Sequence, residues 1–368
     1  MDTNKILTPF FTLILALLSL LPLAVQAEHE VDWAKRLAAQ LEAVDAVYPG
    51  ELGVFVKDLE SGETFSFRGD ERWYLASGVK VPVAIAVMRA IERGALSLDS
   101  KVELLASDYV DGAGETNWHP PGTALSVRYL LDQMLIHSDN TASDMLIRVV
   151  GLDQVNTVAQ ELAPEGFGTI TTLADVRRHA YSSFHEKAFQ LSGEDFFILK
   201  KIRDEHERVE QLAHLLGVPV SDFPVQDLDT AFNAYYATDL NAARLSAYAT
   251  LLEALVDGRA LQPESTQYLL GVMQRVRTGT HRIKAGLPET VSFAHKTGTQ
   301  RARACDFGVA RTAPEEGAKR VLIAACSRGM LSLTRAERAL RAVGEAVEAS
   351  GVLQGSASEL NEGERKAT

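Results

Sequence analysis

The sequence contains Ser77-Gly78-Val79-Lys80 at the start of a helical pattern, followed by Ser138-Asp139-Asn140 and, much later, by Lys296-Thr297-Gly298. In the first string a hydroxyl and an amine lie three residues apart. On a helix they share one face, so the amine can take the proton of the hydroxyl. Any one string alone is weak evidence, but all three in this order indicate one catalytic site.

Ser77 and Lys80 are the predicted nucleophile and base. Lys80 lies in the apolar stretch 79–83, where a lysine without a partner is costly to bury as an ion. A desolvated lysine loses basicity and becomes a usable acceptor for the proton of Ser77. The structural alternative is that Ser77 is only the N-cap of the following helix.

The second string lies between two apolar helical stretches. Its structural interpretation is an ordinary helix cap. In the functional interpretation, Ser138 relays a proton to the departing nitrogen, and Asn140 donates a hydrogen bond to a substrate amide.

The third string lies in a predicted strand. Lys296 and Thr297 can present their polar groups to a substrate carboxylate, and Gly298 lets the ligand approach closely. The N–H groups of Thr299 and Ser77 are the predicted oxyanion hole.

These strings resemble the class A β-lactamase family of penicillin-recognising serine hydrolases. The resemblance runs from about Leu52 to Val343, and further matching stretches carry it: Val79–Val83 leading to Gly94–Asp99, Ser138–Ala142, and Thr278-Gly279 leading to Ala285–Pro288. It implies an exported enzyme that opens β-lactam rings through an acyl-enzyme on Ser77. The alternatives are a D,D-peptidase-like or esterase-like acyl hydrolase of the same fold, or a covalent β-lactam-binding sensor with slow deacylation.

The order of the predicted elements gives an α+β fold of the β-lactamase/transpeptidase type. A helix at 31–47 and a hairpin at 52–67 precede a long helical region, and strands return at 291–299, 304–310 and 321–326 before a last helix at 334–349. The antiparallel sheet is therefore expected from both ends of the chain, with an all-helical lobe inserted. The expected sheet lobe covers about 28–75 and 285–350, the helical lobe about 76–284, and a disordered tail 356–368.

The family carries a deacylating Glu in a Glu-x-x-Leu-Asn string, and this sequence departs from it. The corresponding stretch, 171–181, contains no Glu. The candidate deacylation bases are the nearby Asp175 and the more distant Glu186. Beyond them, 191–235 is predicted to be an insertion with one helix from near Ser192 to Gly217.

The first 27 residues combine Lys5, an apolar run and a small Ala27 before acidic residues, which predicts a cleaved signal peptide. The rival interpretation is an uncleaved membrane anchor. Cleavage predicts a periplasmic or secreted protein that meets a membrane only through this segment.

Cys305 and Cys326 are the two cysteines. With Ala310 opposite Val321 in a hairpin they face each other, and both a disulfide and two free buried thiols remain open.

Composition limits the partners. The chain has 368 residues, 46% of them hydrophobic, which is enough for a large core. Its formal charge is 37 − 49 = −12 with no basic cluster, which argues against nucleic acid as a partner. His206-Glu207 and His214 lack metal-ligand spacing. We expect a monomer without metal or cofactor, acting on a small β-lactam or an acyl-peptide.

Overall fold

The computed structural model describes residues 21–313 and 318–354, with side chains from residue 33 onward. Its centre is a five-stranded antiparallel sheet in the order β2-β1-β9-β8-β7. Two strands come from the start of the described chain and three from its end. The strands are β1 (Glu51–Asp58), β2 (Thr64–Phe67), β7 (Ser292–Gln300), β8 (Arg303–Arg311) and β9 (Arg320–Arg328).

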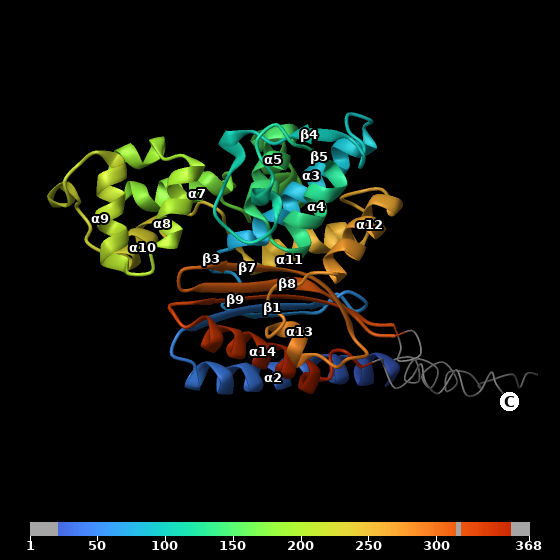
Figure 1. Cartoon of the computed structure of the whole chain (residues 1–368). Helices are drawn as coiled ribbons and strands as arrows, with labels where there is room; N and C mark the ends of the chain where they lie inside the picture. Colours follow the sequence, from blue (N-terminus) through green and yellow to red (C-terminus); the bar gives the residue numbers. More distant parts are fainter. Residues whose placement is uncertain (1–20, 314–317, 355–368) are drawn as a thin grey trace, which may run out of the picture.

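Helices α2 (Leu21–Val47) and α14 (Leu333–Ser350) cover one face of this sheet (Figure 1). Leu37 and Leu41 of α2 pack with Leu340 of α14 and Ile323 of β9 in one buried cluster. The central strand β9 is buried on both faces, because its alternate residues Leu322 and Ala324 belong to the core on the other side. A strand buried on both faces reads as a continuous apolar run.

The other face carries the helical lobe, in which α3 is central. Ten of its residues are buried, and it contacts α4, α5, α6 and α12. Figure 1 shows this lobe above the sheet, with α11 closest to the strands. The helices of this lobe are α3 (Lys80–Glu92), α4 (Val127–Ile136), α5 (Asn140–Val150), α6 (Leu152–Leu162), α11 (Leu245–Val256) and α12 (Pro263–Gln274). The short α13 (Ile283–Gly286) lies on the opposite face beside α14, where Ile283 packs with Leu340 (Figure 1).

Several short elements were not predicted from the sequence. The three-residue strands pair as β3 (Arg72–Tyr74) with β6 (Ala242–Arg244), and as β4 (Lys101–Glu103) with β5 (Ala124–Ser126). Strands this short contain too few alternating positions to leave a periodic signal. Short 3-10 helices are η1 (Ala76–Val79), η2 (Ala106–Asp108), η3 (Thr116–Trp118), η4 (Glu186–Gln190) and η5 (Val220–Asp222).

The segment after α7 (Leu173–Ser182) and η4 projects from the helical lobe as α8 (Gly193–Lys201), α9 (Glu205–Leu216), η5 and α10 (Leu228–Tyr236) (Figure 1). We call residues 191–236 the insert. The prediction of one helix from Ser192 to Gly217 is wrong, although both ends are correct, since Ser192 caps α8 and Gly217 ends α9. Asp204 caps α9 by accepting the Glu207 N–H at 2.9 Å, and this cap restarts the chain as a second helix.

The α+β class, the sheet built from both chain ends and the inserted helices are confirmed. The first helix begins earlier than predicted, at Leu21 instead of Val31. Most of the predicted signal peptide and the predicted disordered tail lie outside the described residues. Within the described part of the chain, no helix is both long and apolar enough to cross a membrane.

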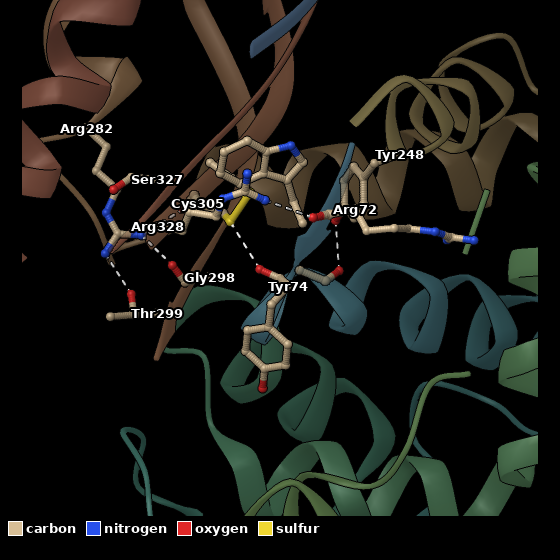
Figure 2. The surroundings of a disulfide bond; sticks show 12 residues. Arg72, Tyr74, Tyr248, Arg282, Gly298, Thr299, Cys305, Ser327 and Arg328 are labelled. Atoms are coloured by element: carbon tan, nitrogen blue, oxygen red, sulfur yellow. Dashed lines mark hydrogen bonds between the residues drawn. A yellow bond between two sulfur atoms is a disulfide. The ribbon is translucent and has the colours of Figure 1, made fainter. Parts of the chain in front are cut away.

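Cys305 and Cys326 form a disulfide. The register is the predicted one, with Cys305 opposite Cys326 and Ala310 opposite Val321. Of the two alternatives left open by the sequence, the bridge is therefore the one observed. Figure 2 shows it beside the strand that carries Tyr74, whose backbone oxygen lies 3.5 Å from Cys305 Sγ.

Removal of this bridge should destabilise the protein without changing its fold. The bridge joins residues 21 positions apart, and closure of a loop of this length contributes roughly 3 kcal/mol in the chain-entropy model. The double variant Cys305→Ala/Cys326→Ala should lose about that much free energy of unfolding in a urea titration followed by circular dichroism. A loss below about 1 kcal/mol would contradict an entropic role for the bridge.

Candidate active site

Ser77 lies in η1, which leads directly into α3. The N-cap positions of η1 and α3 are Leu75 and Val79, and neither position has a side-chain cap. Ser77 is therefore not an N-cap, which removes the structural alternative for this residue. Its half-buried side chain forms no hydrogen bond within the described chain, so the hydroxyl remains available for chemistry.

Lys80 is fully buried in the first turn of α3. Its Nζ donates to the backbone oxygen of Ser138 at 2.6 Å and to Asn140 Oδ1 at 2.8 Å, and it lies 3.3 Å from Ser138 Oγ. The first and second strings of the sequence thus meet at this ammonium group. In the described chain Lys80 has no ion-pair partner, so its hydrogen bonds alone offset its burial.

Ser138 is also held by the third string. Lys296 Nζ donates to Ser138 Oγ at 2.9 Å and to the backbone oxygen of Thr297 at 3.0 Å. A hydroxyl oxygen has two lone pairs and one proton, so an oxygen that accepts from two lysines can direct its own proton elsewhere. Ser138 has a φ of 61°, in the left-handed region that costs energy for a residue with a Cβ.

The cap of α5 is Asp139. Its Oδ1 accepts the Ala142 N–H and its Oδ2 accepts the Thr116 N–H, both at 2.9 Å. Asp139 therefore caps the helix, while its neighbours Ser138 and Asn140 contact Lys80. This cap fixes the chain on both sides of the lysine contacts.

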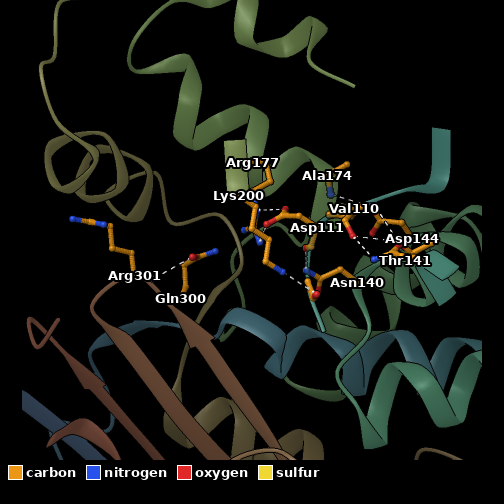
Figure 3. Close-up of polar contacts among 12 residues, drawn as sticks. Val110, Asp111, Asn140, Thr141, Asp144, Ala174, Arg177, Lys200, Gln300 and Arg301 are labelled. Atoms are coloured by element: carbon orange, nitrogen blue, oxygen red, sulfur yellow. Dashed lines mark hydrogen bonds and ion pairs between the residues drawn. The ribbon is translucent and has the colours of Figure 1, made fainter. Parts of the chain in front are cut away.

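Asn140 uses both ends of its amide. Its Oδ1 accepts from Lys80, and its Nδ2 donates to the Asp111 backbone oxygen at 2.7 Å. The amide nitrogen carries a second hydrogen, which is free to donate to a substrate. Arg177 Nε binds the carboxylate of Asp111 at 2.7 Å. Figure 3 shows this chain of contacts from Arg177 through Asp111 to Asn140.

Gly298 brings the edge strand β7 against η1. A Cβ at this position would lie 2.2 Å from the Leu75 backbone oxygen and 3.2 Å from the Ala76 Cβ. Only a residue without a side chain permits this approach. Gly78 is equally confined on the other side, because a Cβ there would lie 2.6 Å from the Phe307 ring. These glycines place the third string beside Ser77.

The sequence did not indicate Arg282, which is fully buried behind β7. Its guanidinium donates to the backbone oxygens of Gly298 and Cys305, at 2.9 and 2.8 Å, and to Thr299 Oγ1 at 2.7 Å (Figure 2). Arg282 therefore fixes the end of β7. Thr297 has a different partner, since its Oγ1 lies 2.5 Å from Thr278 Oγ1.

Burial dominates the electrostatics of the site. Burial lowers the pKa of Lys80 to about 7, against the opposing effect of Asp139 and Asp144. Burial, together with the nearby Lys80 and Arg282, lowers the pKa of Lys296 well below its ordinary value. Two ammonium groups that share Ser138 Oγ repel each other, so each favours loss of a proton by the other.

Asp144 is a second residue that the sequence analysis missed. It lies one helical turn after Asn140 on α5, and its carboxylate oxygens accept the N–H groups of Leu173 at 2.7 Å and Ala174 at 2.9 Å. These bonds hold the first turn of α7 against α5. Burial raises the pKa of Asp144 to about 7, and the two N–H groups and Lys80 oppose that rise. The sequence signal that could have indicated Asp144 is its position four residues after Asn140, which places both side chains on the same face of a helix.

Neither candidate deacylation base contacts the lysine cluster. Asp175 forms an ion pair with Arg178 at 2.8 Å, and Glu186 lies exposed on η4. In the described chain, neither carboxylate forms a hydrogen bond with Ser77, Lys80 or Ser138. The structure thus brings the three strings together and leaves both carboxylates outside this cluster.

The fold and this lysine–serine cluster define a protein of the β-lactamase and penicillin-binding type. Residues 36–350 match the family described as Beta-lactamase enzyme family, so the chain belongs to that family. Over 290 residues it is 22% identical to beta-lactamase VEB-1 of Pseudomonas aeruginosa, covering 78% of each chain. A beta-lactamase of Proteus vulgaris is 25% identical over 281 residues, with 76% of this chain and 75% of that protein covered.

Solved structures agree on the fold. The beta-lactamase of Sphaerobacter thermophilus superposes with a TM-score of 0.62 at 25% identity, covering 88% of this chain and 100% of that one. A mutant of PBP-A, solved as an acyl-enzyme complex with penicillin G, gives a TM-score of 0.65 at 19% identity, covering 86% and 96%. The chain is therefore a class A-like enzyme of the β-lactamase/penicillin-binding fold.

Gly298→Ala should disable the site while leaving the fold intact. The added Cβ would meet the Leu75 backbone oxygen at 2.2 Å and push β7 away from Ser77. A misplacement on the order of 1 Å costs about a hundredfold in rate, which we expect for reaction with a chromogenic cephalosporin.

Gly271→Ala on α12 is the matched control, since a Cβ there meets nothing within 4 Å. It should react like the unmodified protein. Equal rates for both variants would show that the close approach of β7 does not matter for the reaction.

Proposed function

We propose that this protein is an exported serine hydrolase that opens β-lactam rings through an acyl-enzyme on Ser77. The observation that carries the proposal is the buried Lys80, bound to Ser138 and Asn140 and three residues from a serine whose hydroxyl is unengaged in the described chain. A lysine with a pKa of about 7 is neutral in part at physiological pH and can accept the serine proton.

In this proposal the second string completes acylation. Lys80 takes the proton of Ser77 as its oxygen attacks the ring carbonyl, and the C–N bond of the ring then breaks. Ser138 gives its proton to the departing nitrogen and recovers one through the lysines that its Oγ contacts, at 3.3 and 2.9 Å. Asn140 donates its remaining N–H to the substrate amide.

Substrate binding falls to β7. Lys296 and Thr297 hold the substrate carboxylate, and Gly298 admits the ligand close to the strand. The oxyanion hole consists of the N–H groups of Ser77 and Thr299. Because β7 is the edge strand, alternate N–H groups along it have no partner strand and can face the groove.

Deacylation is the slow step in this proposal. Asp175 and Glu186 remain the candidate bases, but the first is paired with Arg178 and the second is exposed. A missing general base costs a hundredfold or more, roughly, so the acyl-enzyme should persist. This observation favours two alternatives as well, a D,D-peptidase-like or esterase-like hydrolase, and a covalent β-lactam-binding sensor.

We further propose that residues 1–27 are a cleaved signal peptide and that 28–355 form one hydrolase domain that acts as a monomer. The sheet lobe, about 28–75 and 285–350, and the helical lobe, about 76–284, would then enclose the groove. A disulfide between Cys305 and Cys326 suits a periplasmic or secreted location.

Intact-mass measurement after mixing with a chromogenic cephalosporin tests this function. The native protein should gain one acyl adduct that decays slowly. Ser77→Ala should gain none, because no other described serine lies three residues before a buried lysine. Ser126→Ala is the control, since Ser126 is a true N-cap, accepting the Tyr129 N–H, and lies at a helix start like Ser77.

The outcomes separate the alternatives. Rapid colour change without a lasting adduct indicates fast deacylation, an adduct that decays slowly indicates the proposed hydrolase, and an adduct that does not decay indicates a sensor. Absence of both indicates a different acyl substrate. An adduct that survives Ser77→Ala would refute the nucleophile.

Acylation should follow the protonation of Lys80. With a pKa of about 7 for Lys80, its neutral fraction and hence the acylation rate should rise about tenfold from roughly pH 6 to roughly pH 8 and then level off. Asp144 raises the pKa of Lys80, so Asp144→Asn should move the midpoint of this rise to lower pH. Stopped-flow acylation over the pH range measures both.

The Asp144→Asn variant also identifies the titrating group, since burial raises the pKa of Asp144 to about 7 as well. A rise that shifts but persists in the variant belongs to Lys80. A pH dependence that vanishes in Asp144→Asn would assign the titration to Asp144 and remove Lys80 as the base.

A further inference from the structure

The insert bridges the sheet side and the helical side of the site. On the sheet side it binds Arg301, which lies just beyond β7. The Arg301 guanidinium forms ion pairs with Glu205 of α9 at 2.6 Å and Asp229 of α10 at 2.5 Å, and Tyr236 Oη donates to the Arg301 backbone oxygen at 2.8 Å. Arg303 lies over the Tyr236 ring, 4.2 Å from its centroid. Several contacts therefore tie α9 and α10 to the end of β7.

On the helical side the insert binds the loop of residues 109–112, which packs against Asn140. Gly193 packs closely on Tyr109, since a Cβ there would lie 2.1 Å from the Tyr109 backbone oxygen. The rings of Phe197 and Tyr109 meet edge to face with centroids 6.5 Å apart. Lys200 Nζ donates to the Gly112 backbone oxygen at 2.9 Å. Helix α8 is therefore fixed against residues 109–112.

Lys200 places a positive charge close to Asn140. Gly112 packs directly on Asn140, because a Cβ on Gly112 would lie 2.7 Å from Asn140 Nδ2. The Lys200 ammonium binds the carbonyl of that same glycine. Figure 3 shows the Lys200 side chain extending from α8 toward the Asn140 end of the cluster.

No carboxylate in the described chain neutralises Lys200. Its hydrogen bond goes to a backbone carbonyl, and it forms no ion pair among the described residues. The nearby Asp111 is bound by Arg177, with both carboxylate oxygens in contact with that guanidinium. An ammonium has three N–H donors, so Lys200 retains two for a ligand.

We propose that Lys200 is a specificity-determining residue that selects substrates whose acyl group carries a carboxylate next to the amide bound by Asn140. This inference rests on the proposed function, since Asn140 then contacts the acyl amide. Lys296 and Thr297 serve the carboxylate on the opposite side of the ring. The substrate thus meets a carboxylate-binding lysine on each side, and the second one is supplied by the insert.

The chemistry favours a carboxylate over a neutral polar group. A charge-assisted hydrogen bond is roughly twice as strong as a neutral one. The contact with Gly112 pre-orders the long lysine side chain, which lowers the entropy cost of binding.

Benzylpenicillin and carbenicillin form a matched pair for the test. Carbenicillin differs from benzylpenicillin by one added carboxylate on the carbon next to the acyl amide. The measured quantity is the ratio of the acylation rate constants for Ser77, carbenicillin over benzylpenicillin, from quenched intact-mass kinetics. The ratio should fall about tenfold in Lys200→Met, and Lys200→Arg should restore most of it.

Lys201→Met is the matched control, because Lys201 is the next residue on α8, is exposed like Lys200, and makes no hydrogen bond to residues 109–112 in the described chain. Its ratio should equal that of the native protein. Equal losses for both penicillins in Lys200→Met would show that Lys200 only holds the insert, and would overturn the assignment.

Failure of the proposed function gives a different result. If neither penicillin acylates Ser77 in the native protein, both the proposed function and the role of Lys200 are wrong. If both acylate Ser77 but the ratio does not change in Lys200→Met, only the role of Lys200 is wrong.

Discussion

Burial of the Lys80 ammonium is the constraint on which the rest of the site depends. A lysine in a hydrophobic lobe requires acceptors, and Ser138 and Asn140 supply them at 2.6 and 2.8 Å. Ser138 meets this requirement in a left-handed conformation that costs energy. The Asp139 cap on α5 holds the strained turn in place. The left-handed backbone conformation of Ser138 is thus the consequence of burying Lys80 away from water, which also lowers the basicity of Lys80.

Lys296 brings a second ammonium group to Ser138 Oγ. Lys296 reaches Ser138 Oγ because Gly298 lets β7 approach η1 and because Arg282 holds the end of that strand. Three cationic side chains therefore converge on a small volume. Their mutual repulsion and their burial both favour neutral lysines, which is the protonation state that proton transfer from a serine requires.

Local patterns predicted the parts of the structure that depend on neighbours in sequence. The alternation along β8 and β9 correctly gave the register of these strands, with Cys305 opposite Cys326. Arg282 and Asp144 act through partners 16 to 30 positions away, so no local pattern marks them. The break before α9 was missed although Asp204 carries an ordinary cap signal, because the apolar periodicity on both sides continues across it.

The contacts at the start of α7 bear on deacylation, the second step of the proposed reaction. Helix α5 carries one carboxylate, Asp144, and its oxygens accept the first N–H groups of α7. A carboxylate bound in this way stabilises a helix start, and the two N–H groups use two of its four acceptor positions. In the proposed reaction the groups for ring opening lie around Lys80, while Asp144 binds the N–H groups of Leu173 and Ala174 and Asp175 pairs with Arg178. In the proposed reaction, product release would therefore depend on the contacts of α7 as well as on the lysine cluster.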